Sequence, residues 1–107
     1  MFNLTRVFLA ADKLSPSQYY AMEKAKRAYK KVHCKCAVCG YGKDLEVHHI
    51  KPVHMEPRLA ADPTNFITLC DTRNTGCHYI WGHFRDFVKG WNCHIVEFAN
   101  YVRKFRY

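Results

Sequence analysis

The sequence predicts a small α+β domain that is held together by a bound metal ion. The chain has 107 residues, which is room for one hydrophobic core and one domain. Two segments with helical periodicity flank a central part with short strand-like segments. Six cysteines accompany seven histidines, and in an intracellular protein this combination favours metal ligation over disulfide bonds.

The charge and the composition limit the classes of function. Lysine and arginine number 17 against 9 aspartate and glutamate residues, a formal net charge of +8 that favours a polyanionic partner such as nucleic acid. Hydrophobic residues make up 49% of the chain, which excludes intrinsic disorder. The apolar run over residues 7–11 is far shorter than the roughly 20 residues of a membrane helix, and it lacks the features of a secretory signal. We therefore expect a cytoplasmic protein with no membrane partner.

The first predicted element is a basic helix over residues 15–33. Ser15 suits the N-cap, Pro16 suits the first helical position, and Gln18 completes a capping box. Apolar residues at helical intervals predict the buried stripe: Tyr19, Met22, Ala25, Tyr29 and Val32. Cations crowd the other faces, which form either a solvated surface or a contact surface for phosphates. The candidate nucleic-acid contacts on this helix are Lys24, Arg27, Lys30 and Lys31.

Four cysteines have a spacing that indicates a structural zinc site. Cys36 and Cys39 form a Cys-x2-Cys turn, which can place two thiolates about 2.3 Å from one ion. Cys70 and Cys77 are the natural third and fourth ligands, although the loop between them, residues 71–76, is longer than usual. The alternative is a set of buried free cysteines, which are common in protein cores.

Two cysteines remain outside this set. Cys34 could replace Cys36 as a ligand, but the longer turn to Cys39 makes it the second choice. Cys93 is expected to pack in a helix rather than to bind metal.

A strand-like segment over residues 45–50 contains two adjacent histidines, His48 and His49. Adjacent residues of a strand point to opposite faces, so one histidine can bind a metal while the other approaches a substrate. A neutral histidine with a pKa near 6.5 is a suitable general base. The alternative is a pair of structural or surface histidines. A second ordered segment follows over residues 64–70.

Two further helical segments complete the predicted order of elements. A short helix over about residues 77–89 carries His78 and His83, whose spacing of five places them about 140° apart on an ideal α-helix. Gly82 can relax the backbone there, and His83 is the second choice of the two as a ligand. A terminal helix over about residues 92–106 has an amphipathic stripe made of Ile95, Phe98, Val102 and Phe105.

The order, residue types and spacing of these motifs resemble the HNH endonucleases, which have a ββα-metal core. The segments that carry the resemblance are CAVC at 36–39, LEVHHIKPV at 45–53, DPTNFITLC at 62–70, and the CH and GH pairs within 77–83. The likeness is closest to small phage-type members with a zinc-binding cysteine quartet. It implies a single domain over residues 1–107, with the ββα-metal core at about 36–89 between the basic helix and the terminal helix.

The same resemblance implies a role for each residue of the motif. His48 takes the first metal-ligand position, where many relatives carry aspartate, and His49 matches the general base. Asn65 matches the central asparagine, which orients the base and braces the loop. His78 matches the final metal ligand of the motif, and His83 is an additional ligand.

The activity that the resemblance implies is metal-dependent hydrolysis of DNA, with 5′-phosphate and 3′-hydroxyl products. The implied catalytic ion is Mg²⁺ or Mn²⁺, while imidazole ligands also accommodate Ni²⁺ or Zn²⁺. A structural Zn²⁺ on the four cysteines is separate from it. The expected partner is double-stranded DNA, with further candidate contacts at Lys51, Arg73 and Arg85. We expect a monomer or a homodimer, and for a phage-encoded chain the host cytoplasm and phage packaging or processing proteins as candidate partners.

Two other classes of function stay open from the sequence. A zinc-stabilised DNA-binding module would bind DNA without cutting it. A disulfide-bonded secreted binding protein would have paired cysteines and no zinc. The joint occurrence of His48, His49, Asn65 and His78 favours the nuclease.

Overall fold

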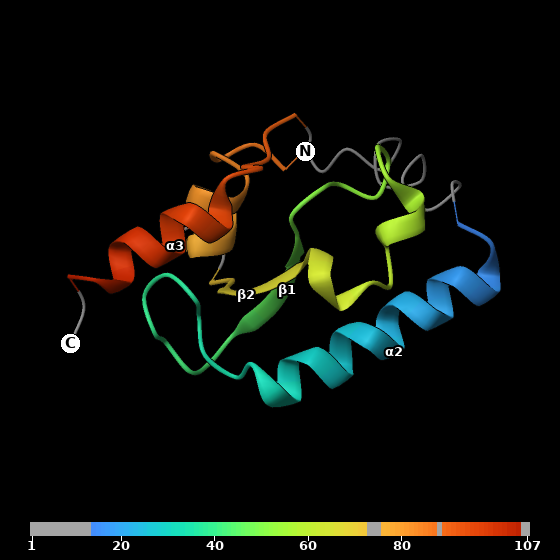
Figure 1. Ribbon diagram of the computed structural model, residues 1–107, viewed down its shortest axis with the longest axis horizontal. Helices are drawn as coiled ribbons and strands as arrows, with labels where there is room; N and C mark the ends of the chain where they lie inside the picture. The colour runs from blue at the N-terminus through green and yellow to red at the C-terminus, as the bar shows by residue number, and fades with distance from the viewer. Residues whose placement is uncertain (1–13, 73–75, 88, 106–107) are drawn as a thin grey trace.

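The computed structural model describes residues 14–72, 76–87 and 89–105 and has a small α+β fold. Figure 1 shows a central two-stranded sheet with helix α2 on one side and helix α3 on the other. The ranges of the helices and strands are α2 (Pro16–Val32), β1 (Leu45–His49), the 3-10 turns η1 (Pro57–Leu59) and η2 (Pro63–Asn65), β2 (Phe66–Cys70), the π-helical turn η3 (His78–Gly82) and α3 (Ile95–Arg103). These elements, with a cysteine cluster that can hold a metal, make a fold consistent with the HNH ββα-metal arrangement predicted above.

Helix α2 begins as its capping signals predict. The side chain of Ser15 accepts a hydrogen bond from the backbone N–H of Gln18, and the Gln18 side chain accepts one from the Ser15 N–H. Met22 is buried, but Tyr19 and Val32 are 47% and 76% exposed, so the prediction of a continuous buried stripe was wrong at both ends. A 17-residue helix is about 25 Å long, whereas five-residue strands span about 17 Å, so the ends of α2 extend past the sheet.

Strands β1 and β2 pair antiparallel, with His48 opposite Ile67 and His49 opposite Phe66. On one face, Phe66 meets α2: its ring lies edge-on to Tyr29, whose hydroxyl donates to the Phe66 carbonyl oxygen at 3.1 Å. The other face carries His48 toward η3. Since successive strand residues alternate between faces, the two histidines point to opposite sides of the sheet.

The main hydrophobic core lies between the sheet, the cysteine turn and α3. Leu69 and Ile95 are completely buried in it, and Ala99 packs there one helical turn further along α3. A second, smaller cluster of Leu14, Met22 and Ala60 secures the start of α2 against the loop that follows β1. The loop therefore has a fixed position relative to the sheet.

The last third of the chain departs from the prediction. The helix expected over 77–89 is a five-residue π-helix that ends at Gly82, because Phe84 and Arg85 have left-handed φ angles of 51° and 64° that reverse the chain. Helix α3 covers Ile95–Arg103 rather than 92–106, and Phe105 lies beyond it with 66% of its surface exposed. None of the described helices is long and apolar enough to cross a membrane.

Candidate functional site

The four predicted zinc ligands form one cluster. The sulfur atoms of Cys36, Cys39, Cys70 and Cys77 all lie within 4.8 Å of one another, and the Cys39 and Cys70 sulfurs are 3.6 Å apart. Four thiolates at about 2.3 Å from a tetrahedral ion would be about 3.8 Å apart, so the arrangement fits zinc. Cys34 and Cys93 are exposed and lie outside the cluster.

Backbone amides already point at these sulfurs. The Cys39 N–H donates to the Cys36 sulfur at 3.4 Å, and the Cys77 N–H donates to the Cys70 sulfur at 3.3 Å. The hydrogen bond from the Cys77 thiol lowers the pKa of Cys36 to about 4 and raises the pKa of Cys77 itself, while burial raises the pKa of Cys70. The cluster thus holds a thiolate beside thiols whose protons a metal would displace.

Gly76 allows the chain between Cys70 and Cys77 to return to the end of β2. A Cβ at this position would lie 2.5 Å from the carbonyl oxygen of Cys70 and 2.6 Å from the backbone nitrogen of Thr72. Only glycine therefore lets the chain return so closely to the end of β2. This close approach explains how a six-residue interval brings both sulfurs to one point.

Three histidines form a second cluster, which includes His48 on the face of β1 opposite to His49. His48, His78 and His83 each offer one ring nitrogen, and these three nitrogens lie within 4.8 Å of one another. The Nε2 atoms of His78 and His83 are 3.2 Å apart. His48 is 1% exposed, and neither of its ring nitrogens has a hydrogen-bond partner. Burying such a group without a partner is costly, so the donor set fits a bound cation.

The outer nitrogen of His83 has a hydrogen-bond partner that fixes the orientation of the ring, and the outer nitrogen of His78 faces a carboxylate at a longer distance. His83 Nδ1 donates to the carbonyl oxygen of Gly90 at 2.8 Å, which leaves its Nε2 lone pair directed at the cluster. His78 Nδ1 faces Asp71 Oδ1 at 3.6 Å. Metal-bound histidines in proteins commonly have such carboxylate or carbonyl partners on the second nitrogen.

Burial keeps the cluster neutral. It lowers the pKa of His48 to about 2 and the pKa of His78 to about 4, with a further contribution from the neighbouring imidazoles. Burial also lowers the pKa of His83. Neutral imidazole is the form that binds metals, so these rings need no deprotonation at neutral pH.

The π-helix explains how His78 and His83 meet despite a spacing of five. An α-helix would place them far apart around the axis, whereas the wider π turn pairs residues i and i+5. Gly82 permits close packing there, since a Cβ on it would lie 3.1 Å from Leu69 Cδ1 and 3.2 Å from the His48 ring. His83 therefore contributes a ring nitrogen to the cluster, as His78 does.

His49 lies on the opposite face with a fixed ring orientation. Its Nε2 lies 2.9 Å from the Ala60 carbonyl oxygen, which can only accept, so Nε2 carries the proton and Nδ1 the basic lone pair. Its ring also packs edge-on against Phe66. Burial lowers the pKa of His49, against the opposing effect of the Ala60 carbonyl, which keeps the ring neutral near pH 7.

Asn65 forms hydrogen bonds to backbone atoms near both residues of the His49–Ala60 hydrogen bond. Its side chain accepts from the Lys51 N–H at 2.8 Å and donates to the Lys51 and Leu59 carbonyl oxygens at 3.0 and 3.4 Å. Lys51 is two residues after His49, and Leu59 directly precedes Ala60. All these contacts are to backbone atoms, so Asn65 can position His49 through the two loops.

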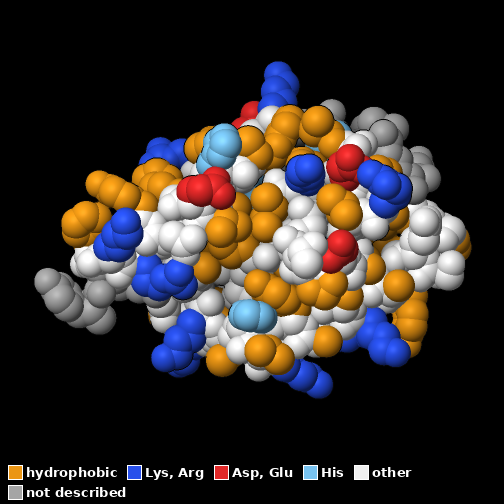
Figure 2. Space-filling model, in the orientation of Figure 1, with side chains coloured by type: hydrophobic (Ala, Val, Ile, Leu, Met, Phe, Trp, Pro, Cys, Tyr) orange, Lys and Arg blue, Asp and Glu red, His pale blue; other side chains and the backbone are white. Residues whose placement is uncertain are grey.

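The predicted phosphate contacts have different environments. Lys24, Arg27, Lys31, Lys51 and Arg85 are exposed. Lys30 is half-buried, and its Nζ donates to the Leu45 carbonyl oxygen at 3.3 Å, so it also ties α2 to β1. Arg73 lies outside the described residues. Figure 2 shows lysines and arginines around the rim of one face of the molecule, with hydrophobic side chains between them.

Several contributors to the site carry no motif in the sequence. Asp71, Gly90 and Ala60 act on the histidines through one carboxylate and two carbonyl oxygens, as described above. Backbone carbonyls leave no signal in residue type. Asp71 could have been found only from its position directly after a cysteine of the zinc set.

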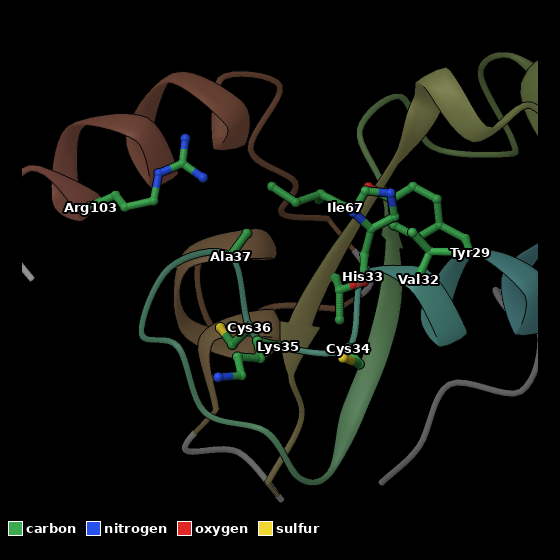
Figure 3. A pocket seen from close by; sticks show the side chains of 10 residues that line it. Tyr29, Val32, His33, Cys34, Lys35, Cys36, Ala37, Ile67 and Arg103 are labelled. Carbon is green, nitrogen blue, oxygen red and sulfur yellow. The ribbon is translucent and has the colours of Figure 1, made fainter. Parts of the chain in front are cut away.

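A shallow cavity of about 350 Å³ lies away from the histidine cluster, between the end of α2, the cysteine turn and α3 (Figure 3). Its walls include Tyr29, Ile67 and Arg103 together with residues 33–37. No residue of the histidine cluster lines it. The cavity is therefore separate from the histidine cluster, although Cys36 of the cysteine cluster lines it.

Comparison with known families agrees with this geometry. The family model of the HNH endonucleases matches residues 36–79. The matched segment includes the four clustered cysteines, His48, His49, Asn65 and His78, and it ends before His83. No curated protein and no solved structure matches the chain. Residues 36–79 of this chain are therefore similar to the HNH endonucleases.

Proposed function

We propose that this protein is a metal-dependent endonuclease that hydrolyses phosphodiester bonds in double-stranded DNA. One observation carries the proposal: the three-histidine cluster contains His48, and the next residue along β1 is a neutral histidine whose Nδ1 is the basic nitrogen. His49 is the last residue of the strand, so the proposed metal ligand and the proposed base follow each other at the end of β1.

The chemistry follows from the charge of the substrate. A phosphodiester is anionic and resists attack by hydroxide, so hydrolysis requires a positioned nucleophile and a compensating positive charge. A divalent cation on His48, His78 and His83 would supply that charge at the phosphate and the leaving oxygen. Mg²⁺ and Mn²⁺ are the ions we propose, with Ni²⁺ or Zn²⁺ as further candidates for imidazole ligands.

His49 performs the proton transfer in this proposal. Its Nδ1 accepts a proton from the attacking water as the water oxygen bonds to phosphorus, and the ring becomes cationic. The bond from phosphorus to the 3′ oxygen breaks in the same reaction, and the leaving oxygen takes a proton from solvent water. The Ala60 carbonyl continues to accept from Nε2 and stabilises this cation. Asn65 holds the two backbone segments that set the ring's position, and it touches neither water nor phosphate.

The cysteine cluster has a structural role in this proposal. Four thiolates complete a tetrahedral zinc shell and leave no position for a substrate, as is typical of structural zinc. Exposed cations, including Lys24, Arg27 and Lys51, contribute contacts to DNA phosphates. Backbone contacts of this kind carry little sequence information, so we propose weak sequence selectivity.

The test is cleavage of supercoiled plasmid by zinc-loaded protein with Mg²⁺, Mn²⁺ or Ni²⁺. Wild type should nick or linearise the plasmid, and His49→Ala should lower the rate at least about 100-fold, the usual contribution of a general base. His94→Ala is the matched control, because this histidine is highly exposed and lies outside both clusters. Equal cutting by wild type and His49→Ala would contradict the mechanism. DNA binding without cutting by any of the proteins would instead identify a zinc-stabilised DNA-binding module.

A further inference from the structure

The chain turns sharply directly after the last histidine of the cluster. Phe84 and Arg85 are consecutive non-glycine residues with left-handed backbone conformations, which are unfavourable for both side chains. Such conformations persist only where surrounding contacts impose them, and they concentrate at functional sites. The turn is therefore a feature that the rest of the site maintains at a cost in stability.

Hydrogen bonds at both ends of the turn impose this geometry. The Arg85 N–H donates to the Tyr79 carbonyl oxygen, and the Asn92 N–H donates to the Gly82 carbonyl oxygen, both at 2.8 Å. The Gly90 carbonyl oxygen accepts from His83 Nδ1. Gly90 itself cannot be replaced, since a Cβ there would collide with the His83 carbonyl oxygen. The turn thus orients His83 and exposes Phe84 at the same time.

The exposed side of the turn is aromatic and cationic. Phe84 is 57% exposed and Phe87 is 46% exposed, and Arg85 between them is exposed as well. The Phe87 ring lies 4.9 Å from the His83 ring and 5.4 Å from the His78 ring, measured between centroids. Phe87 therefore borders the histidine cluster, and Phe84 directly follows the last histidine of the cluster with its ring exposed.

A phenyl ring in this position has a specific use when a nucleic-acid strand is bound. A phosphate that reaches the histidine cluster brings its neighbouring nucleotide within range of the residue that follows His83. Stacking on an aromatic side chain requires an exposed base face, which a paired and stacked duplex does not offer. Unpaired bases in gaps, flaps and single strands offer it without the cost of opening the helix.

We propose that Phe84 stacks on an unpaired base beside the scissile phosphate, so that the preferred substrate is DNA with unpaired nucleotides at the cleavage point. The inference rests on the proposed function, since it concerns the substrate of the same site. Arg85 contacts the phosphate of the stacked nucleotide, and Phe87 forms the wall between that base and the histidine rings.

The test measures binding, so that cleavage does not interfere. It uses the zinc-loaded His49→Ala protein with Mg²⁺ and two fluorescein-labelled 40-base-pair DNAs, one fully paired and one with a five-nucleotide gap that contains 2-aminopurine. Fluorescence anisotropy gives the two dissociation constants, and quenching of 2-aminopurine reports stacking. We expect tighter binding of the gapped DNA by about tenfold, together with quenching, as is typical of one base stacked on an aromatic ring.

Variants in the same background assign the effect to Phe84. Phe84→Asn removes the ring while asparagine accepts the left-handed backbone, and it should abolish both the preference and the quenching. Phe84→Trp keeps an aromatic face and should retain them. Tyr101→Ala, at a ring 60% exposed on α3, is the matched control and should change neither. Thermal melts establish that each variant is folded.

The outcomes separate this inference from the proposed function. Equal affinity for paired and gapped DNA, or a preference that survives in Phe84→Asn, overturns the role of Phe84 and leaves the nuclease proposal intact. Failure to bind either DNA overturns the DNA-directed function and this inference with it. If Tyr101→Ala also lost the preference for gapped DNA, that preference would depend on exposed aromatic side chains in general, and the inference would be overturned.

Discussion

The cysteine cluster and the histidine cluster both consist of side chains that can bind a metal ion, but they differ in the number of coordination positions that they would leave open. Four cysteine sulfurs converge on one point and can complete a tetrahedral shell, whereas the second cluster offers three imidazole nitrogens. Cys77 and His78 are consecutive in the chain, yet one belongs to each cluster. Closed shells are typical of structural sites, and open positions are typical of catalytic sites. The comparison teaches that one short stretch of chain can supply donors to two clusters of different kinds.

The contacts that support the cysteine cluster also differ from those that support the histidine cluster. Backbone N–H groups of Cys39 and Cys77 point at sulfur atoms, which suits thiolates that stay permanently bound. Of the histidines, His83 instead donates from its outer nitrogen to the Gly90 carbonyl, and the outer nitrogen of His78 faces the Asp71 carboxylate at 3.6 Å. Changes at the two clusters should therefore have different consequences.

The largest effect is expected from removing a cysteine ligand. Cys36→Ser should abolish zinc binding and unfold the protein, because a structural zinc contributes on the order of 10 kcal/mol or more, comparable with the whole stability of a small domain. Circular dichroism and metal analysis of the purified protein would measure this. Cys34→Ser is the matched control: it removes an exposed thiol two residues away and should retain one zinc and the fold. If both variants lost zinc equally, the ligand assignment would be wrong.

A smaller effect is expected at the histidine cluster, on activity rather than on folding. In Gly82→Ala the new methyl group would press on Leu69 and on the buried His48 ring, at 3.1 and 3.2 Å. We expect cleavage to fall by about 10- to 100-fold, as for other changes that disturb the orientation of a metal ligand, with zinc still bound by the cysteines. Plasmid cleavage rates and metal content would measure the two effects separately.

The control for this prediction comes from another glycine. A Cβ on Gly42 would meet nothing within 4 Å, so Gly42→Ala should leave both clusters unchanged. Loss of zinc together with activity in Gly82→Ala would show that the clusters are not independent, and the comparison between them would fail.

The features that could be predicted from the sequence are those that depend on residues close together in the chain. The capping box of Ser15 and Gln18 and the Cys36–Cys39 turn are local signals, and the alternation of His48 and His49 follows from strand geometry alone. The bounds of α2 agree with the prediction, but the burial of Tyr19 and Val32 at its ends was predicted incorrectly, because burial depends on the length of the sheet that covers the helix. Helical periodicity cannot report that length.

The convergence of His78 and His83 could not be predicted from α-helical geometry. It requires a π-helix, and the backbone of that helix is set by the close packing of Gly82 on β1 and β2 and by the left-handed turn after His83. These are contacts between segments far apart in the sequence. The carbonyl partners of His49 and His83 escaped prediction for the same reason, since any residue type can supply a carbonyl.

The smallest effect is expected at Asn65, which belongs to neither cluster and braces only the surroundings of His49. Asn65→Ala would leave the Lys51 N–H without its side-chain acceptor and remove two further hydrogen bonds, which costs about 1–3 kcal/mol of unfolding free energy. The turnover rate should fall by about tenfold at unchanged DNA affinity, because the backbone that holds the base loosens while the phosphate contacts remain. Chemical denaturation and single-turnover kinetics would measure both quantities. Asn100→Ala, at an exposed position on α3, controls for loss of an amide. A loss of DNA affinity at constant turnover rate would instead assign Asn65 to the substrate-binding surface, and His49 would then be positioned by β1 and Ala60 alone.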